Sequence, residues 1–391
     1  MGRRYRCPCG KVASVPESLT PDLVDLRDRV TALAAEHLVP LRPTAFGEVH
    51  GPERAALADA VRRASKAAGV FGLAQPVEFG GIGAGALALT VARDVLGRHD
   101  VAHLPGVFGP APGALADVGE PLRSSHLLPL LAGERQGGFA FTEPEDGGRR
   151  TWARAAGDTL VVTGRKSYVT GGADADFLTA LVDVEGTGPA MLVIDTAADG
   201  VRLVRRFSSL DGSHHAAFEF DEVRVPRTHV LGEPGRGMRQ ALGVVGGVRL
   251  ALAGIATGLC GAVVDHVDTH LRTVAARRPE LPNERVRLRY GELRILAFAV
   301  RSTVYRTARL VDAGGDDTRN EVSAAKVFAT EAVGTIVDEA IQLVGGHALE
   351  DDHPLAGIHR RVRAMRLAEG ATDVLRINVA KGALDLGLGR L

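Results

Sequence analysis

A single carboxylate stands among apolar and small residues near the C-terminus, in the stretch RLAEGATDVLR, residues 366–376. Glu369 follows Leu367 and Ala368 and precedes Gly370. A carboxylate held away from water is a stronger base than a solvated one, because desolvation disfavours its charged form and raises its pKa. Many glutamates in such a string simply begin or end a helix. The residues alone therefore leave two interpretations, a general base or a solvated turn residue.

An arginine in an apolar stretch is the second candidate for chemistry. Arg249 lies in VVGGVRLALAG, between Val248 and Leu250. The ordinary interpretation is an exposed arginine on a helix. The apolar neighbours favour instead a charge that lines a binding site.

The composition excludes several classes of partner. The chain has 391 residues, of which 45% are hydrophobic, and its 47 Lys and Arg balance its 47 Asp and Glu. This balance gives no electrostatic reason to expect nucleic acid or an anionic membrane surface as a partner. No run of about 18 uncharged apolar residues appears, so we expect no membrane span. The basic N-terminus, MGRRYRCPCGKVAS, lacks the apolar stretch of a secretory signal, and we expect a cytoplasmic protein.

The cysteines give no strong indication of a metal or a disulfide framework. The chain has three cysteines, Cys7, Cys9 and Cys260, so they cannot all pair within one chain. A reducing compartment is therefore expected. A structural zinc site needs four ligands, and no histidine lies near Cys7 and Cys9. We therefore expect no metal site and interpret residues 1–19 as a loose tail.

Periodicity predicts three domains and an α+β, mostly α fold. Residues 20–136 show helical spacing after a capping Thr20, interrupted by a glycine-rich loop at Pro76. Residues 137–236 contain short β-branched and aromatic runs between turn residues, which indicate a compact, barrel-like β-domain. Residues 237–391 return to long helices and predict a four-helix bundle, in which Asn320 would cap a helix that stops at Gly345 and Gly346.

Six segments in this order resemble signatures of the acyl-CoA dehydrogenase family, over residues 20 to about 385. They are PVEFGG, LLPLLAGERQGGFAFTEP, KSYVTGG, FEFDEVRVP, AAKVFATEAVGTIVDEAIQLVGG and AEGATDVLR. The resemblance implies FAD-dependent α,β-dehydrogenation of an acyl thioester, with a hydride passed to flavin N5. The thioester would be acyl-CoA or an acyl-carrier protein, and the electrons would leave to an electron-transfer flavoprotein or a similar acceptor. A homotetramer, or a homodimer, is expected.

The same resemblance assigns roles to individual residues. Glu369 stands where the family keeps its α-proton base, 27 positions after Gln342, as in the commonest pattern. Arg249, Gly370 and Gly148 would meet the substrate. In the family, the backbone N–H of the base also helps to hold the thioester oxygen. The FAD contacts implied are Phe139, Phe141, Thr142, Gly147, Tyr168, Thr170, Gln342, Gly345, Gly346, Ala371, Thr372 and Asp373.

Two of these assignments carry geometric expectations. Tyr168 would lie behind the flavin ring, because a flat aromatic side chain stacks well there. Gln342, Gly345 and Gly346 would reach the FAD diphosphate of a neighbouring subunit, since glycine lets a backbone approach closely.

The sequence departs from the family pattern at four places. Tyr168 replaces the usual Trp. The G-A-G-S-D loop reads EDGGR, without its serine, and the D-x-x-R pair reads GGVR, without its acid. The R-x-x-F-G loop is shortened to AARRPELPNE, in which Arg277 or Arg278 would take the place of the arginine although no Phe-Gly follows. These changes favour a specialised branch that acts on a carrier-protein thioester or on a short polar acyl group.

Two other functions stay open at this stage. A flavin monooxygenase or N-oxidising enzyme on the same fold would generally lack the glutamate base, so Glu369 argues against it. A non-catalytic paralogue would have little reason to keep the base, the arginine and the flavin segments in register. The basic stretch RRVRAMR, residues 360–366, is either a solvated helix side or a grip for a CoA phosphate.

Overall fold

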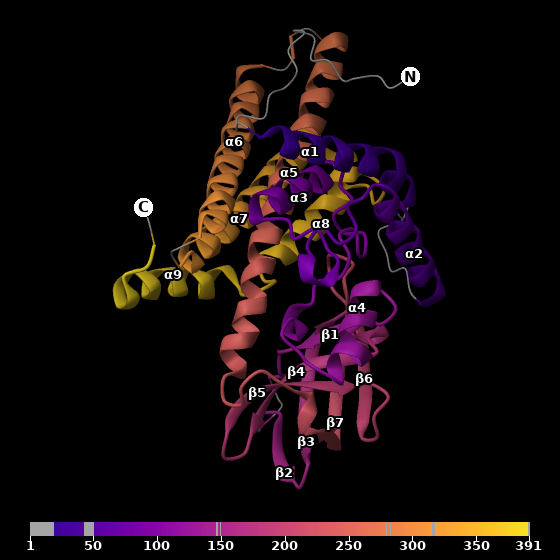
Figure 1. Ribbon diagram of the computed structural model, residues 1–391. Coiled ribbons are helices and arrows are strands. Elements are labelled where there is room, and N and C mark those ends of the chain that lie inside the picture. Colours follow the sequence, from indigo (N-terminus) through magenta and orange to yellow (C-terminus); the bar gives the residue numbers. More distant parts are fainter. Residues whose placement is uncertain are drawn as a thin grey trace.

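The computed structural model describes residues 19–42, 51–145, 148, 150–278, 280–281, 283–314 and 317–389. Helices come first, then a sheet, then a second and larger set of helices, which confirms the predicted order (Figure 1). The sheet forms one end of the molecule, and the two helical parts lie together at the other end.

The N-terminal part is a small helical layer with its own core. Its helices are α1 (Pro21–Leu33), α2 (Gly51–Ala67), α3 (Ala86–Arg98) and the short α4 (Leu128–Ala132). Thr20 occupies the N-cap of α1, although its side chain makes no capping hydrogen bond, and Pro21 follows it. Leu26, Val30 and Leu33 are buried, as expected for the apolar stripe of an amphipathic helix.

The central sheet has eight strands. They are β1 (Gly137–Ala140), β2 (Trp152–Ala156), β3 (Thr159–Thr170), β4 (Phe177–Val184), β5 (Gly188–Asp195), β6 (Val201–Ser208), β7 (His214–Pro226) and β8 (Val230–Leu231). Their order is β6-β7-β3-β2-β4-β5-β8, with β1 added parallel to β4. Among the described residues β6 and β8 do not pair, so the sheet is not a closed barrel and the predicted term barrel-like describes it only loosely.

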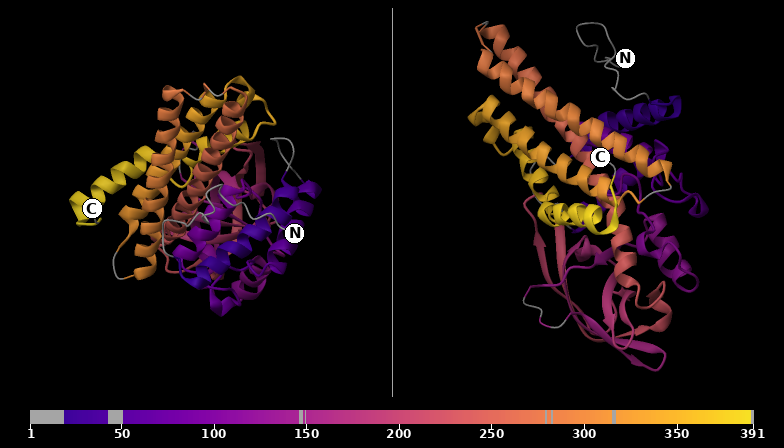
Figure 2. Two further views of the ribbon diagram at one scale, coloured as in Figure 1. Left: turned by 90° about the horizontal axis from the view of Figure 1, so that it is seen from above. Right: turned by 90° about the vertical axis from the view of Figure 1, so that its left-hand side faces the viewer.

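The C-terminal part is built around three long consecutive helices. They are α5 (Gly237–Arg277), α6 (Glu284–Ala313) and α7 (Arg319–Val344), followed by α8 (Pro354–Met365) and α9 (Thr372–Leu386). α7 contacts α5, α6, α8 and α9, which makes it the central helix of this part. Figure 2 shows α9 leaving the bundle at an angle on its outer side.

Helix α5 links all three parts. It begins beside β4 and β5 and continues through the bundle (Figure 1). A Cβ added to Gly258 on α5 would lie 2.0 Å from the carbonyl oxygen of Asp94 on α3, so only glycine permits this close helix packing. α5 is also long and apolar enough to cross a membrane by length and composition alone. About 56% of its apolar window is buried in the protein, as in the core helix of a bundle.

The predicted cap of α7 was wrong. The helix begins at Arg319, with Thr318 in the N-cap position, and Asn320 lies within its first turn. The Asn320 side chain is buried and donates to the carbonyl oxygens of Val379, at 3.1 Å, and Leu388, at 3.2 Å. It therefore joins α7 to the end of α9 instead of capping its own helix.

Candidate active site

The loop between α8 and α9, residues 366–371, presents Glu369 in an unusual backbone conformation. The φ angles of Glu369 and Gly370 are +55° and +106°. Gly370 tolerates a positive φ, whereas a residue with a Cβ pays about 1–2 kcal/mol for the left-handed conformation. Such strain persists only where surrounding contacts over-determine it, and it clusters at functional sites.

Arg249 on α5 makes the first of these contacts. Its Nε donates to the carbonyl oxygen of Glu369 at 3.0 Å. The guanidinium is half-buried, and burial lowers its pKa while the charge of Glu369 raises it. The structure thus brings together Glu369, Gly370 and Arg249, three residues that the sequence suggested for the substrate site.

Lys326 on α7 makes the second contact, and sequence reasoning missed it. Its side chain is completely buried, and its Nζ donates to the carbonyl oxygens of Gly370, at 2.9 Å, and Arg366, at 3.3 Å. Burial lowers the pKa of Lys326 to about 8. A signal was present in the sequence, because Lys326 lies seven residues before the apolar Val333 and therefore on the same side of the helix.

The carboxyl group of Glu369 is partly withdrawn from water. Burial raises the pKa of Glu369, while the charges of Arg249 and Lys326 lower it. Its neighbours in the sequence are apolar or small, so both of these charges come from distant parts of the chain. The net direction is still upward, which is the direction that strengthens a carboxylate as a base.

The predicted flavin residues of the sheet lie on adjoining segments. The rings of Phe139 and Phe141 are parallel, with centroids 5.9 Å apart. The N–H of Ser167 donates to the carbonyl oxygen of Thr142 at 2.9 Å, which joins the segment after β1 to the end of β3. Tyr168 follows with a φ of +53° and a side chain that is 60% exposed.

Aromatic neighbours support the exposed ring of Tyr168. Its ring meets Phe207 edge-on at a centroid distance of 5.0 Å, and His215 at 5.8 Å. The hydroxyl of Thr170 lies 3.2 Å from Nδ1 of the same histidine. An exposed flat ring, held in a strained backbone by neighbouring rings, is a surface that suits a planar ligand.

A buried ion pair fixes the segment after Phe141, and it too was missed from the sequence. Lys166 Nζ lies 2.6 Å from Glu143 Oε1 and donates to the carbonyl oxygen of Phe141 at 3.3 Å. Glu143 also accepts from the N–H of Thr151. Burial lowers the pKa of Lys166, and Glu143 opposes that shift.

The residues predicted to reach the FAD diphosphate, Gln342, Gly345 and Gly346, lie far along α7 from Glu369. Sixteen residues separate Lys326 from Gln342, which at the helical rise corresponds to about 24 Å. Gly345 ends α7 with a φ of +93°, and a Cβ added to Gly345 or Gly346 would meet nothing within 4 Å. This open backbone suits close approach by another molecule. Arg277 is the last residue of α5, and Arg278 follows it.

The remaining predicted residues lie at the start of α9 and in the loop after β1. Ala371 is the N-cap of α9, Thr372 is its buried first residue, and Asp373 is exposed and paired with Arg376 at 3.2 Å. Gly148 is exposed with a φ of +67°. Gly147, like Cys7 and Cys9, lies outside the described residues.

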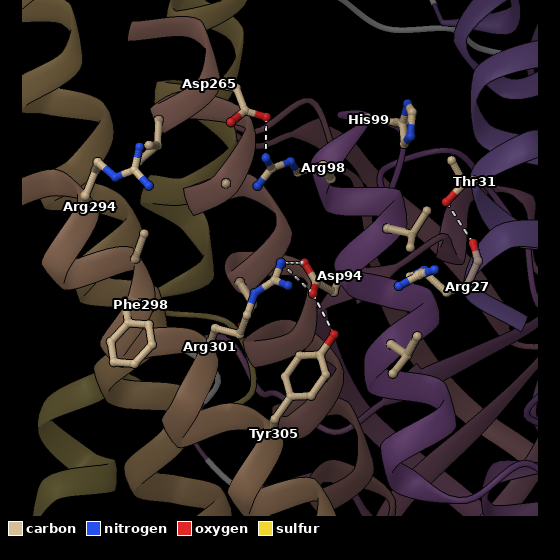
Figure 3. Close-up of a pocket in the computed structure, with 16 residues that line it drawn as sticks. Arg27, Thr31, Asp94, Arg98, His99, Asp265, Arg294, Phe298, Arg301 and Tyr305 are labelled. Atoms are coloured by element: carbon tan, nitrogen blue, oxygen red, sulfur yellow. Dashed lines mark hydrogen bonds and ion pairs between the residues drawn. The ribbon is translucent and has the colours of Figure 1, made fainter. Parts of the chain in front are cut away.

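A cavity of about 490 Å³ lies elsewhere, between α1, α3, α5 and α6 (Figure 3). None of the predicted site residues lines it. Asp94 sits between Arg301, at 2.8 Å, and the hydroxyl of Tyr305, at 2.7 Å, while Asp265 faces Arg98. Asp94 and Asp265 therefore already have partners, and we attribute these pairs to the packing of the N-terminal helices on the bundle. Within the described ranges no group of three His, Cys, Asp or Glu residues is placed to hold a metal ion.

Comparisons with known proteins agree with this arrangement. The profile of the acyl-CoA dehydrogenase N-terminal domain matches residues 20–134, and that of the C-terminal domain matches residues 235–384. The human mitochondrial very long-chain specific acyl-CoA dehydrogenase is 27% identical over 382 residues, covering 88% of this chain and 56% of its own length. The 3-(aryl)acrylate reductase of Clostridium sporogenes is 26% identical over 335 residues, covering 81% of this chain and 88% of its own.

A solved structure gives the same result. The structure of a "probable acyl CoA dehydrogenase" from Mycobacterium abscessus superposes with a TM-score of 0.82 at 26% identity, covering 93% of this chain and 98% of that one. The chain therefore belongs to the acyl-CoA dehydrogenase family. The class is that of FAD flavoproteins, oxidoreductases that act on CH–CH groups.

Proposed function

We propose that this protein is an FAD-dependent dehydrogenase that introduces a 2,3-double bond into an acyl thioester, with Glu369 as the base. One observation carries the proposal. A half-buried carboxylate with a raised pKa is held in a strained left-handed conformation, at the position where the family keeps its base. A glutamate that merely began or ended a helix would need neither feature.

The chain supplies the groups that removal of an α-proton requires. The carboxylate of Glu369 takes the proton, and negative charge then develops on the thioester oxygen. Among the hydrogen bonds of the described residues, the backbone N–H of Glu369 donates to no protein acceptor, so it is free for that oxygen. Arg249 fixes the neighbouring carbonyl and adds positive charge beside the site.

The residues present fit FAD. The exposed ring of Tyr168, with Thr170 beside it, and the segment from Phe139 to Thr142 offer a flat surface with backbone groups. When bound, FAD accepts the hydride. Lys166 and Glu143 hold the segment in place, and the glycine turn after Gln342 is open for the diphosphate of a neighbouring subunit's cofactor.

Assembly and partners follow from the same proposal. The distance along α7 between Lys326 and Gln342 separates the base from the diphosphate segment, so we infer that two subunits complete one FAD site. The outer side of α9 exposes apolar side chains, as a subunit contact requires: Val374, Ile377, Leu384 and Leu386. A homotetramer, cytoplasmic location and an electron-transfer flavoprotein or similar acceptor complete the proposal.

The identity of the substrate's acyl group is a question for experiment. The named relatives include an enzyme for very long chains and one for an arylacrylate, so their names indicate no single chain shape. We propose anaerobic mixing of the flavin-loaded protein with a panel of acyl-CoA and acyl-carrier thioesters while flavin absorbance is followed. At least one thioester is expected to bleach the flavin band.

The same assay tests the base. Glu369→Gln keeps size and hydrogen bonding but cannot take the proton, so flavin reduction is expected to fall by roughly 10² to 10⁴-fold. Dithionite should still reduce the flavin, which separates lost chemistry from lost cofactor. Glu134→Gln, at an exposed glutamate, is the matched control and should react as the wild type does. Reduction of the Glu369→Gln variant at the wild-type rate would refute the role of Glu369.

A further inference from the structure

Two cations from different helices, the half-buried Arg249 and the buried Lys326, hold the backbone of the loop 366–371. Arg249, from α5, holds the carbonyl oxygen of Glu369, and Lys326, from α7, holds those of Arg366 and Gly370. Three carbonyl groups of a six-residue loop thus accept charge-assisted hydrogen bonds, which are roughly twice as strong as neutral ones. Lys326 bridges the two ends of the loop, whereas Arg249 holds only its middle.

A second clamp lies one turn further along α7. Glu331 pairs with Arg376 on α9 and lies 3.7 Å from Arg366, and it also accepts from the hydroxyl of Thr372. This clamp holds the flanks of the loop at the protein surface. It leaves the backbone of Glu369 and Gly370 to Arg249 and Lys326.

The buried lysine is energetically expensive, so its retention calls for a reason. Lysine is almost never fully buried, and its charge is costly to remove from water. Facing it are Arg249 from α5, Glu369 from the loop and Glu331 from its own helix. Glu369 is half-buried, and among the described contacts the hydrogen-bond partners of Lys326 are carbonyl oxygens, not carboxylates. A methionine would fill the same space without the penalty.

We propose that Lys326 is a positioning residue for the base, which holds Glu369 in its left-handed conformation and sets its acid strength. This inference rests on the proposed role of Glu369. The carbonyl contacts keep the carboxylate aimed at one place, and the positive charge opposes the rise in its pKa that burial causes. Lys326 itself does not touch the substrate or exchange a proton with it.

The test compares variants of the flavin-loaded protein by the pH dependence of flavin reduction. Lys326→Met removes the charge and both hydrogen bonds at similar length. The plateau rate is expected to fall by roughly 10 to 10²-fold, the usual effect of a small misplacement of a catalytic group. The acid limb of the profile is expected to move to higher pH, because the pKa of Glu369 rises when a neighbouring positive charge is lost.

Further variants separate charge from packing. Lys326→Arg keeps the positive charge, so its acid limb should stay at the wild-type pH even if its rate falls. Lys326→Gln loses the charge but keeps a donor, and it replaces Lys326→Met if that variant does not fold; its acid limb should also move to higher pH. Lys66→Met, at an exposed lysine on α2, is the matched control and should change neither quantity. FAD content, measured from absorbance, should be the same in all variants.

The outcomes distinguish this inference from the proposed function. If Glu369→Gln is slow but both charge-removing variants keep the wild-type acid limb, Lys326 is only a structural residue and the inference is wrong. If Glu369→Gln itself reacts at the wild-type rate, the proposed role of Glu369 as the base is refuted, whatever the Lys326 variants show. A shifted acid limb in Lys326→Met, with an unshifted limb in Lys326→Arg, supports the inference.

Discussion

Replacing Glu369 should reveal strain stored in the backbone of the proposed base. Glu369→Gly and Glu369→Ala both remove the half-buried carboxylate, so they lose the same charge. They differ in one respect, since alanine keeps a Cβ at a φ of +55° and glycine does not. We expect the Glu369→Gly variant to be the more stable of the two, although neither retains the base.

The size of the difference follows from two opposing terms. The left-handed conformation costs a residue with a Cβ about 1–2 kcal/mol, and glycine avoids this cost. Glycine also makes the unfolded chain more flexible, which opposes folding by about 0.4–1 kcal/mol. The balance leaves roughly 0.5–1 kcal/mol in favour of glycine. For a chain of this length, that corresponds to a rise in melting temperature of about 1–2 °C.

Thermal unfolding at saturating FAD measures this difference. Ala368→Gly is the matched control, because Ala368 is not among the described residues with a positive φ. There glycine gains nothing in the folded state and should lower the melting temperature. A Glu369→Ala variant as stable as Glu369→Gly would show that the loop relaxes, and the argument from strain would be refuted.

Two further predictions concern the cofactor and the assembly. Tyr168→Ala should weaken FAD binding in a fluorescence titration, whereas Tyr168→Trp should bind nearly as well because it keeps a flat ring; equal affinity in Tyr168→Ala would remove Tyr168 from the site. The flavin-loaded protein should be a multimer by light scattering, and Ile377→Asp, on the exposed apolar side of α9, should dissociate it while Lys66→Ser, at an exposed lysine on α2, does not. A flavin-loaded wild-type monomer would contradict the shared FAD site.

Local patterns predicted the helices well and the sheet only in part. Apolar residues at helical spacing located α1, α3 and α7, because each helix buries one stripe against a neighbour. Strand β6, VRLVRRFS, was missed, since three arginines interrupt its apolar residues and most of its side chains are not buried. Whether a sheet closes depends on pairing between distant strands, and no local pattern contains that information.

The sequence indicated charged residues of the candidate site but not the side chains that hold them in place. Glu369 and Arg249 were recognisable because a charge in apolar sequence is conspicuous. Lys326 and Lys166 were not, because each lies in a regular element where a lysine is usually solvated. Asn320 shows the same limit, since a local capping rule gave way to hydrogen bonds with the backbone of α9.

Arg249 and Lys326 together bear on two conflicting requirements of the loop that carries Glu369. A base must be withdrawn from water to gain strength, yet it must be ionised before substrate arrives. Burial alone would raise the pKa of Glu369 and favour the protonated form, whereas a direct ion pair would weaken the base. Arg249 and Lys326 bind the loop through its carbonyl groups instead, so their charges act on the carboxylate from behind its own backbone. In the proposed mechanism, these cations therefore oppose the rise in the pKa of Glu369 that burial causes, without pairing directly with its carboxylate.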